Sequence, residues 1–328
     1  MTGNITDAKT TCTGSAANEK SICAFSTTGA SGTDPQPAQV EQGNASAYDD
    51  TPAAKRAKTR PHPHEGEHHT LMANDLTCGY KGKAVLSHVS LTVESERITC
   101  LLGPNGVGKT TLFKTLLGFL PAIDGAITVD GENRASLSRK QFARKVSYVP
   151  QTHEPPFSYS VLDMVLTGCV SRLSTLESPH KKDYDRAVEV LDDLGIGHLA
   201  ARSYTAISGG EQQMALIARA LMQNARILMM DEPTAALDFG NQVAVLSCIK
   251  AMAGRGHGII MTSHNPDHAF LCCTDAALIT REGDIISGPV DDVVTEENLH
   301  RAYGIDVRIT TADGPLGEPV KTCVPMLT

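Results

Sequence analysis

The sequence predicts an α/β fold with a parallel sheet, and two observations carry that prediction. Short apolar runs have the length and continuity of buried strands, among them ITCLL (Ile98–Leu102), ILMM (Ile227–Met230) and GIIMTS (Gly258–Ser263). Between such runs lie longer segments with apolar residues at helical spacing, such as EQQMALIARALMQ (Glu211–Gln223). Strands that alternate with helices favour a parallel sheet with helices on both faces.

The elements of the first half follow in chain order. HVSLTV (His88–Val93) alternates apolar and polar residues, which is typical of a half-buried strand, and the buried strand Ile98–Leu102 comes next. TLFKTLLGFL (Thr111–Leu120) has helical spacing and closes near Gly118. GAITVDG (Gly125–Gly131) is a strand flanked by turn glycines.

The second half continues the alternation. DYDRAVEVLDDLGI (Asp183–Ile196) and Glu211–Gln223 are amphipathic helices, and the buried strands Ile227–Met230 and Gly258–Ser263 follow. AALITREGDIISGP (Ala276–Pro289) has two apolar stretches around a glycine-containing turn, so we expect a hairpin.

Composition bounds the class of protein. The chain has 328 residues, 41% of them hydrophobic, so a substantial core is expected, and its net charge of −8 argues against a general nucleic-acid binder. The nine cysteines show no recurring zinc spacing, which favours reduced thiols in a cytosolic protein. No apolar run approaches the ~18–20 residues of a membrane span, so a membrane role would be exercised from outside the bilayer.

Three segments are expected along the chain. Residues 1–69 are rich in Thr, Ser, Ala, Gly, Pro and charge and predict a disordered tail, 70–310 form the folded domain, and 311–328 form a C-terminal tail. Two features of the first tail, KRAKTR (Lys55–Arg60) and HPHEGEHH (His62–His69), are interpreted as a solvated charge run and a polar linker. A lipid- or nucleus-directed patch and a weak metal site are the alternatives.

The stretch GPNGVGKTT (Gly103–Thr111) has the spacing G-x-x-x-x-G-K-[ST] between a predicted strand and a predicted helix. Its glycines let the backbone turn its N–H groups toward a phosphate, and the helix N-terminus adds partial positive charge. Lys109 would neutralise the β- and γ-phosphates, Thr110 would offer its hydroxyl to Mg²⁺, and Thr111 would lie near the α-phosphate. The pattern therefore predicts a site for ATP with Mg²⁺.

A second constellation ends the strand Ile227–Met230. Asp231 follows directly and suits the Mg²⁺ shell, and Glu232, one residue further, is placed to polarise an attacking water as general base. The alternative interpretation is that these two acidic residues only cap a helix.

From Leu71 to Ile309 the chain resembles the ATPase subunit of an ATP-binding cassette transporter. ISGGE (Ile207–Glu211) is similar to the signature motif of that family, which is usually written LSGGQ. The resemblance implies a P-loop nucleoside triphosphatase core with an antiparallel β subdomain and a helical subdomain over about 152–222. It also implies roles for single residues: Tyr80 stacks on adenine, Gln151 senses Mg²⁺ and the γ-phosphate, Asp238 belongs to the D-loop, and His264 is the switch histidine.

The expected site residues have five roles. The catalytic residues are Glu232, His264 and Gln151; the ATP-binding residues are Tyr80, Gly103, Pro104, Asn105, Gly106, Val107, Gly108, Lys109, Thr110 and Thr111; the signature residues are Ser208, Gly209, Gly210 and Glu211; the D-loop residue is Asp238; and the Mg²⁺ ligands are Thr110, Gln151 and Asp231.

His264 has an alternative interpretation, because His268, Cys272 and Cys273 follow it closely and could form a metal site with it. A histidine at a strand end that points to phosphate is the preferred interpretation, with His268 facing elsewhere.

The chain thus carries two candidate phosphate cradles, and the resemblance gives the second one a purpose. In the family two subunits meet head to tail, and each ATP lies between one phosphate loop and the other subunit's signature. Ser208 and the N–H groups of Gly209 and Gly210 suit the partner's γ-phosphate. One loop and one signature per chain are what a homodimer with two complete sites requires.

The resemblance also implies a transporter around the subunit. THEPPFSYSVLDMVLTG, SHNPDHAF and ENLHRAYGIDV resemble importers of ferric siderophores, haem, cobalamin and molybdate. We therefore expect an ATPase that powers an importer of metal chelates at the cytoplasmic face of the membrane, with separate permease subunits, an extracytoplasmic substrate-binding protein and no nucleic acid. Three alternatives stay open: an ATPase of another transporter class, a DNA-repair or translation cassette, and a regulator that does not hydrolyse ATP.

Overall fold

The computed structural model describes residues 68–151, 158–174, 177–314 and 317–327. The predicted N-terminal tail up to residue 67, with Lys55–Arg60 and most of the histidine-rich stretch, lies outside the described residues. The first residues of the predicted helical subdomain, 152–157, do so as well.

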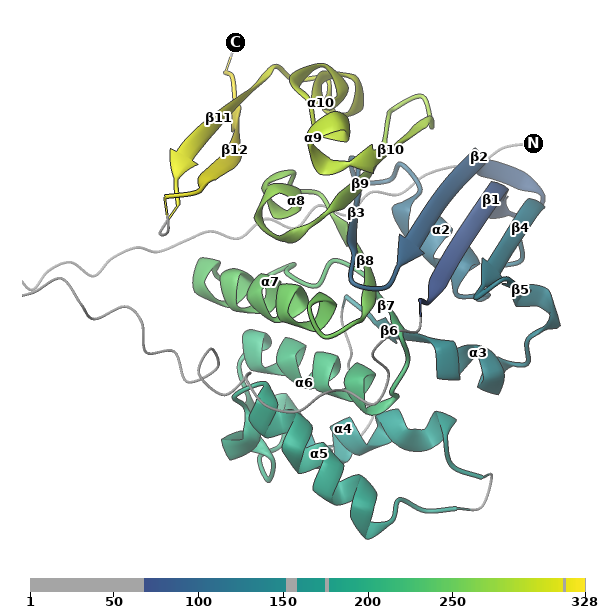
Figure 1. Cartoon of the computed structure of the whole chain (residues 1–328), viewed down its shortest axis with the longest axis vertical. Helices are drawn as coiled ribbons and strands as arrows, with labels where there is room; N and C mark the ends of the chain where they lie inside the picture. Colours follow the sequence, from purple (N-terminus) through teal and green to yellow (C-terminus); the bar gives the residue numbers. More distant parts are fainter. Residues whose placement is uncertain (1–67, 152–157, 175–176, 315–316, 328) are drawn as a thin grey trace, which may run out of the picture. The chain divides into compact units, whose positions relative to one another are not determined.

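A six-stranded sheet, largely parallel, forms the centre of the described domain, as predicted (Figure 1). Its strand order is β10-β9-β3-β8-β7-β6, and the pairs β9/β3, β3/β8, β8/β7 and β7/β6 are parallel. The predicted hairpin is the antiparallel pair of β9 and β10. The strands are β3 (Ile98–Leu102), β6 (Val146–Val149), β7 (Ile227–Met230), β8 (Gly258–Ser263), β9 (Asp275–Ile279) and β10 (Ile285–Pro289).

Both faces of this sheet are buried, which explains why its strands are continuous apolar runs rather than alternating ones. Because successive side chains of a strand point to opposite faces, each strand serves two separate cores. One core contains Ile98, Cys100, Leu102, Leu228, Met230, Ile259 and Met261. The other contains Leu101, Ile227, Met229 and Ile260.

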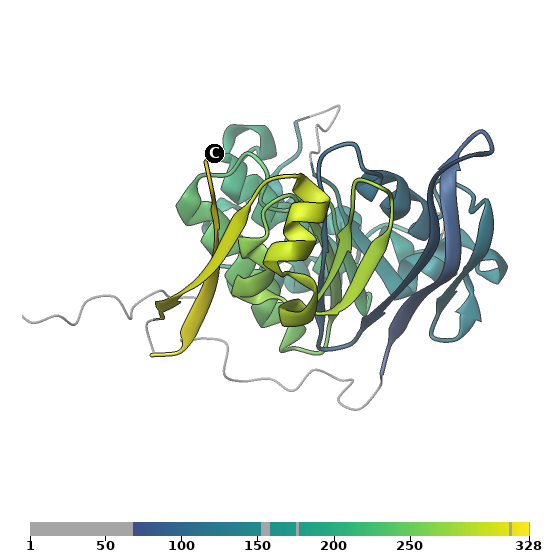
Figure 2. The same ribbon diagram turned by 90° about the horizontal axis from the view of Figure 1, so that it is seen from above.

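An antiparallel sheet and helix α2 (Lys109–Leu116) cover the second core. The sheet has the order β2-β1-β4-β5, and α2 contacts β1 and places Leu112, Phe113 and Leu116 in this core (Figures 1 and 2). This sheet is the expected antiparallel β subdomain. Its strands are β1 (Thr70–Tyr80), β2 (Lys83–Glu94), β4 (Asp124–Val129) and β5 (Glu132–Asn133).

Helices on the other side form the subdomain that carries the signature motif. α6 packs against α4 and α5, and apolar residues at helical spacing such as Ala187, Val190 and Leu191 of α5 are buried there. The helices are α4 (Val161–Leu166), which continues as a 3₁₀ turn at Thr167–Ser171, α5 (Lys181–Asp193) and α6 (Gly209–Met222).

The C-terminal segment differs from the prediction. Residues 311–328 were expected as a tail, but β11 (Val307–Asp313) and β12 (Pro319–Pro325) form an antiparallel hairpin across the expected domain end at 310. The Cys323 N–H donates to Asp267 Oδ1 at 2.7 Å and Lys321 pairs with Asp291 at 2.7 Å, which attaches the hairpin to the domain. The β11–β12 hairpin is mostly exposed, so its sequence has only a weak pattern of apolar residues. The remaining helices are α3 (Arg139–Lys145), α7 (Phe239–Ala253), α8 (Asp267–Cys272), α9 (Val290–Val293) and α10 (Glu296–Tyr303).

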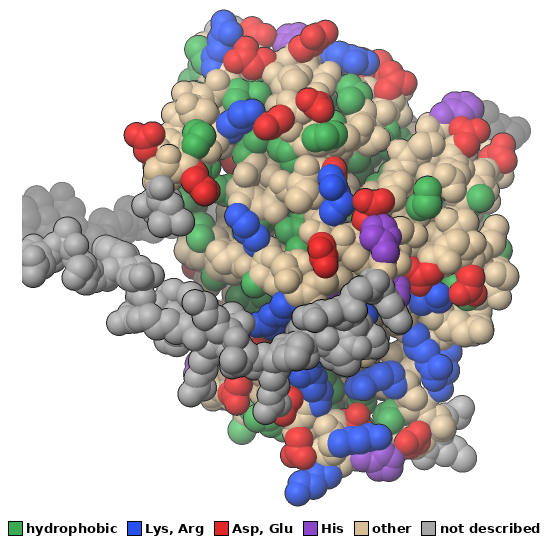
Figure 3. All heavy atoms as spheres, viewed as in Figure 1, with side chains coloured by type: hydrophobic (Ala, Val, Ile, Leu, Met, Phe, Trp, Pro, Cys, Tyr) green, Lys and Arg blue, Asp and Glu red, His purple; other side chains and the backbone are tan. Residues whose placement is uncertain are grey.

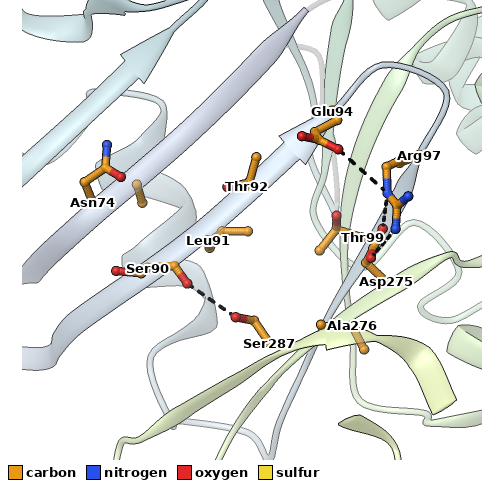
Figure 4. A pocket seen from close by; sticks show the side chains of 12 residues that line it. Asn74, Ser90, Leu91, Thr92, Glu94, Arg97, Thr99, Asp275, Ala276 and Ser287 are labelled. Carbon is orange, nitrogen blue, oxygen red and sulfur yellow. Dashed lines mark hydrogen bonds and ion pairs between the residues drawn. The ribbon is translucent and has the colours of Figure 1, made fainter. Parts of the chain in front are cut away.

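A polar pocket of about 500 Å³ lies where the antiparallel sheet faces the β9–β10 hairpin (Figure 4). At its rim the Arg97 guanidinium donates to both carboxylate oxygens of Asp275, at 2.7 and 2.6 Å. Arg97 precedes β3 and Asp275 begins β9, so this ion pair joins the starts of two neighbouring parallel strands.

Within the described part of the chain, no helix is long and apolar enough to cross a membrane. On the face drawn in Figure 3, acidic and basic side chains are interspersed with apolar ones.

Candidate nucleotide-binding site

The expected catalytic groups lie at the carboxyl ends of four adjacent parallel strands. The phosphate loop follows β3, His264 follows β8, Asp231 and Glu232 follow β7, and Gln151 lies two residues after β6. The register aligns these ends, since Leu102 pairs with Ser263, and Met230 with Val149. Parallel strands deliver ligand-binding residues to this edge of a sheet.

The phosphate loop has the backbone that its glycines were expected to supply. Gly103, Gly106 and Gly108 have φ values of 149°, 83° and 118°, a region that residues with a Cβ rarely adopt. At Gly103 a Cβ would also come within 2.9 Å of the Ile279 carbonyl oxygen, so this position excludes a side chain on two counts. Asn105, Gly106 and Thr110 are exposed, which leaves the loop open to a ligand at the start of α2.

Lys109 is 6% exposed, and its ammonium group donates to the carbonyl oxygens of Gly103 at 2.6 Å and Pro104 at 3.1 Å. Burial lowers the pKa of Lys109, while the charges of Glu232 and Asp231 act in the opposite direction. The lysine is therefore held inside its own loop, where the charges of the two carboxylates that follow β7 act on it.

Thr262 joins those two acidic residues through one hydroxyl. Its Oγ1 donates to Asp231 Oδ1 at 2.8 Å and accepts the Glu232 N–H at 2.7 Å. Asp231 is buried, and that burial, with the neighbouring charge of Glu232, raises its pKa even though the Thr262 hydrogen bond opposes the shift. A cation at this carboxylate would offset the cost of its burial.

Two further predicted residues contact Glu232. Gln151 Nε2 donates to Glu232 Oε2 at 3.0 Å, and His264 Nδ1 lies 3.7 Å from Glu232 Oε1. Gln151 and His264 are exposed and Glu232 is half-buried, so the three side chains meet at the surface above the strand ends. The structure thus brings together all three residues that were expected to be catalytic.

Tyr80 lies at the end of β1 and is 46% exposed. Its hydroxyl accepts a long hydrogen bond of 3.5 Å from Thr111 Oγ1. The ring is therefore next to the phosphate loop, with a surface free to contact a ligand.

The signature residues begin helix α6. Ser208 is its N-cap, and Glu211 completes a capping box: the Ser208 N–H donates to Glu211 Oε2 at 2.7 Å and the Glu211 N–H donates to Ser208 Oγ at 3.4 Å. Ser208 and Gly209 are exposed, whereas Gly210 is buried against Asn241 of α7. Asp238 is the N-cap of α7 and accepts both the N–H and the side-chain amide of Asn241, each at 2.8 Å.

The structure does not bring the signature to the phosphate loop of its own chain. α6 packs with α4, α5 and α7, while the phosphate loop and α2 adjoin the antiparallel sheet (Figure 1). Among the described residues, no hydrogen bond joins Ser208 or Glu211 to the phosphate loop.

The donor set fits Mg²⁺. The Thr110 hydroxyl, the Asp231 carboxylate and the Gln151 side-chain amide supply oxygen atoms, which this ion prefers, and a cation would offset the cost of burying Asp231. The alternative metal site around His264 and His268 finds no support, because the described residues contain no group of three His, Cys, Asp or Glu that could hold a metal ion.

Sequence reasoning missed three supporting residues: Thr262, Asn241 and His268. Thr262 was recognisable as a polar residue in the apolar run of β8, two positions before His264. No sequence pattern marks Asn241, because its role depends on the packing of helix α6 against helix α7. His268 was expected to face elsewhere than the phosphate; it is buried, and its Nδ1 faces the hydroxyls of Ser263 and Thr234.

Comparison with known proteins agrees with this geometry. The family model described as "ABC transporter" matches residues 86–235. An ABC transporter ATP-binding protein of Haemophilus influenzae is 42% identical over 233 residues, which are 71% of this chain and 89% of the relative. The manganese transport system ATP-binding protein MntB of Bacillus subtilis is 34% identical over 233 residues, 70% of this chain and 91% of that one.

A solved structure is similar over most of the chain. It is described as an inward-facing conformation of a metal-chelate type ABC transporter, with a TM-score of 0.71, 30% identity, and coverage of 79% of this chain and 98% of the other.

Proposed function

This chain belongs to the ATP-binding proteins of ABC transporters and hydrolyses ATP to power transport; on that premise we propose that it is the ATPase subunit of an importer of metal chelates. The observation that carries the proposal is the row of aligned parallel strand ends that holds the phosphate loop with Lys109, Asp231 and Glu232. Each of these groups has a distinct task in phosphoryl transfer to water.

Nucleotide binding is assigned to the phosphate loop and Tyr80. Backbone N–H groups from Gly103 to Thr111 and the start of α2 receive the phosphates, Lys109 adds positive charge, and Tyr80 stacks on the adenine. Thr110, Asp231 and Gln151 hold Mg²⁺, which when bound neutralises phosphate charge during transfer. Lys109 must exchange its bonds to the Gly103 and Pro104 carbonyls for bonds to phosphate.

Hydrolysis is assigned to Glu232, with Gln151 and His264 at its side. The carboxylate accepts a proton from the attacking water, which raises the water's nucleophilicity. Gln151 donates to the same carboxylate at 3.0 Å and so orients it. His264 Nδ1 lies 3.7 Å from the same carboxylate, and we assign His264 to stabilise charge on the phosphate side.

A dimer completes the site in this proposal. Ser208, Gly209, Gly210 and Glu211 serve the ATP bound to the phosphate loop of a second copy, and Asp238 lies in the same contact. The exposure of Ser208 and Gly209, away from their own chain's phosphate loop, supports this assignment.

ATP-binding subunits of this family work with membrane permease subunits. We assign this chain to the cytoplasmic face of a permease that receives its cargo from an extracytoplasmic binding protein. The metal-chelate type transporter, at 30% identity, favours a chelate such as a ferric siderophore, haem or cobalamin as cargo. The manganese relative favours a free divalent metal ion as the second candidate.

ATP hydrolysis by the purified chain tests the chemistry. Glu232→Gln should retain ATP binding and lower kcat roughly 10²–10⁴-fold, because the general base is lost while the shape of the side chain is kept. Glu282→Gln, on the turn between β9 and β10, is the matched control and should hydrolyse ATP at the wild-type rate. Equal turnover by wild type and Glu232→Gln would refute the assignment.

Cargo is tested in vesicles that contain this chain together with its permease and binding protein. ATP-dependent uptake of a labelled ferric siderophore, haem or cobalamin, with no uptake of free Mn²⁺, is the expected result. Uptake of free Mn²⁺ alone would establish the second candidate instead.

A further inference from the structure

His268 is a buried titratable side chain that the proposed mechanism does not use. It lies in α8, is 6% exposed, and its Nδ1 faces two hydroxyl groups: Ser263 Oγ at 3.0 Å and Thr234 Oγ1 at 3.4 Å. Ser263 immediately precedes His264, and Thr234 comes two residues after Glu232. One imidazole nitrogen therefore touches both loops that carry the proposed catalytic pair.

The loop after β7 has a backbone that needs support. Glu232 has φ of 44° and Ala236 has φ of 58°, so two residues with side chains adopt left-handed conformations within five positions. Such conformations persist only where neighbouring contacts hold them, and they cluster at functional sites. Thr262 holds the start of this loop through the Glu232 N–H, and Thr234, further along, faces His268.

We propose that His268 is a positioning residue: its Nδ1 holds the Thr234 loop and the Ser263–His264 loop together, and so sets the separation between Glu232 and His264. That separation is 3.7 Å between Glu232 Oε1 and His264 Nδ1. A carboxylate or imidazole displaced by ~1 Å can lower a rate about 10²-fold. The inference rests on the proposed roles of Glu232 and His264.

The hydrogen bonds of Ser263 guide the assignment of the hydrogen on the His268 ring. Ser263 Oγ accepts the Asn265 N–H at 3.0 Å and donates its one hydrogen to the Asn265 carbonyl at 3.2 Å. With that hydrogen on the Asn265 carbonyl, Ser263 accepts from His268 at 3.0 Å, so we assign the ring hydrogen to Nδ1. An asparagine at this position can present an amide N–H near the same place, whereas a leucine fills similar volume without any donor.

The surroundings favour a neutral imidazole. Burial lowers the pKa of His268, the charge of His264 adds to that effect, and Asp267 opposes it. The Cys272 thiol donates to the His268 backbone carbonyl at 3.3 Å and leaves the ring unchanged. A neutral imidazole with its hydrogen on Nδ1 supplies the donor that the bridge uses.

Steady-state ATP hydrolysis by three variants of the full chain tests the proposal. His268→Leu should lower kcat roughly 10–100-fold and leave the KM for ATP within about twofold, because the phosphate loop and Tyr80 are untouched. His268→Asn should recover most of the rate. His257→Leu replaces a buried histidine at the opposite end of β8 and is the matched control, expected to keep the wild-type kcat.

Melting temperatures separate positioning from a general structural role. His268→Leu should melt within a few degrees of wild type, since an apolar residue of similar size replaces a polar one in a buried site. A folded His268→Leu with wild-type kcat, or with a raised KM and unchanged kcat, would overturn the proposal.

Thr234→Val decides the matter if His268→Leu does not fold. It removes one hydroxyl from the same bridge with little change in shape, and it should lower kcat; an unchanged kcat would overturn the proposal. In a folded His268→Leu background, Thr234→Val should cost little more, as members of one bridge are not additive. Glu232→Gln, measured in parallel, separates this proposal from the proposed function. Wild-type turnover by Glu232→Gln would refute the proposed function. Slow turnover by Glu232→Gln, with a wild-type kcat in His268→Leu and Thr234→Val, would refute only the role of His268.

Discussion

Thr262 shows how much of this site depends on a single hydroxyl. It donates to the carboxylate proposed to bind Mg²⁺ and accepts the backbone N–H of the proposed general base, with both distances below 2.9 Å. Because the same oxygen bonds the Asp231 carboxylate and the Glu232 backbone N–H, strand β8 helps to place both residues. The placement of Asp231 and Glu232 therefore depends on a residue about 30 positions away in the sequence.

Tyr80 gives a prediction at the same scale. Its hydroxyl makes only a 3.5 Å bond to Thr111, so Tyr80→Phe should leave ATP affinity near the wild-type value. Tyr80→Ala removes the stacking surface and should weaken binding by about 1–3 kcal/mol. Calorimetric titration with ATP measures both. Identical Kd values for wild type and both variants would remove Tyr80 from the site.

Helix α6 carries the next level of organisation, because its first turn contacts α7. A Cβ on Gly210 would come within 2.4 Å of Asn241 Cγ, while a Cβ on Gly209 would meet only Leu237 Cδ2, at 3.7 Å. The Asn241 side chain cannot withdraw without losing its amide hydrogen bond to Asp238 Oδ2. The signature and the D-loop are therefore packed as one unit within the chain.

This contrast predicts opposite effects on stability for two adjacent glycines. Gly210→Ala should lower the free energy of unfolding by about 1–3 kcal/mol, the usual cost of overpacking. Gly209→Ala should be neutral or stabilising by up to about 1 kcal/mol, because alanine favours a helix more than glycine does. Chemical denaturation measures both variants, and equal losses would contradict the packing described.

Strands β3 and β9 are joined by the Arg97–Asp275 ion pair seen in Figure 4. Burial alone would raise the pKa of Asp275, but hydrogen bonds from Arg97 and Thr274 and the charge of Arg97 together lower it. A lowered folded-state pKa stabilises the fold above the unfolded value of ~3.9, and this contribution is lost as pH falls through the folded-state pKa.

Asp275→Asn should therefore destabilise the chain at pH 7 by about 1 kcal/mol or less, since Arg97 is partly exposed to solvent. The difference from wild type should shrink below pH ~4. Denaturation at pH 7 and at the lowest pH where both proteins stay folded measures it. A difference that grows on acidification would have the wrong sign.

The sequence anticipated those elements whose burial pattern is local. Strands β3, β7 and β8 are buried on both faces, so each is a continuous apolar run, and the site residues follow them directly. The β11–β12 hairpin was missed because it buries little, with Val307 the one buried residue of β11. Thr262, Asn241 and His268 were missed as supports because their partners come from other elements, which only the packed fold brings together.

At the scale of the whole molecule, the chain has two proposed phosphate-binding segments that its own fold keeps apart. The phosphate loop lies at the ends of the parallel strands, and Ser208 and Gly209 are exposed at the start of a helix in another subdomain. If the signature acts on a second copy, two broken chains can complement each other. Lys109→Ala removes the loop's charge and keeps the signature, whereas Ser208→Arg keeps the loop and blocks the signature.

The most direct test is ATP occlusion in an enforced mixed dimer of Lys109→Ala and Ser208→Arg at saturating nucleotide. The loop of the second chain then faces the signature of the first, which makes one intact site and one doubly broken site. Dimers of either variant alone should trap no ATP, and the mixed dimer should trap one ATP. A mixed dimer of folded, paired chains that traps none would contradict the account.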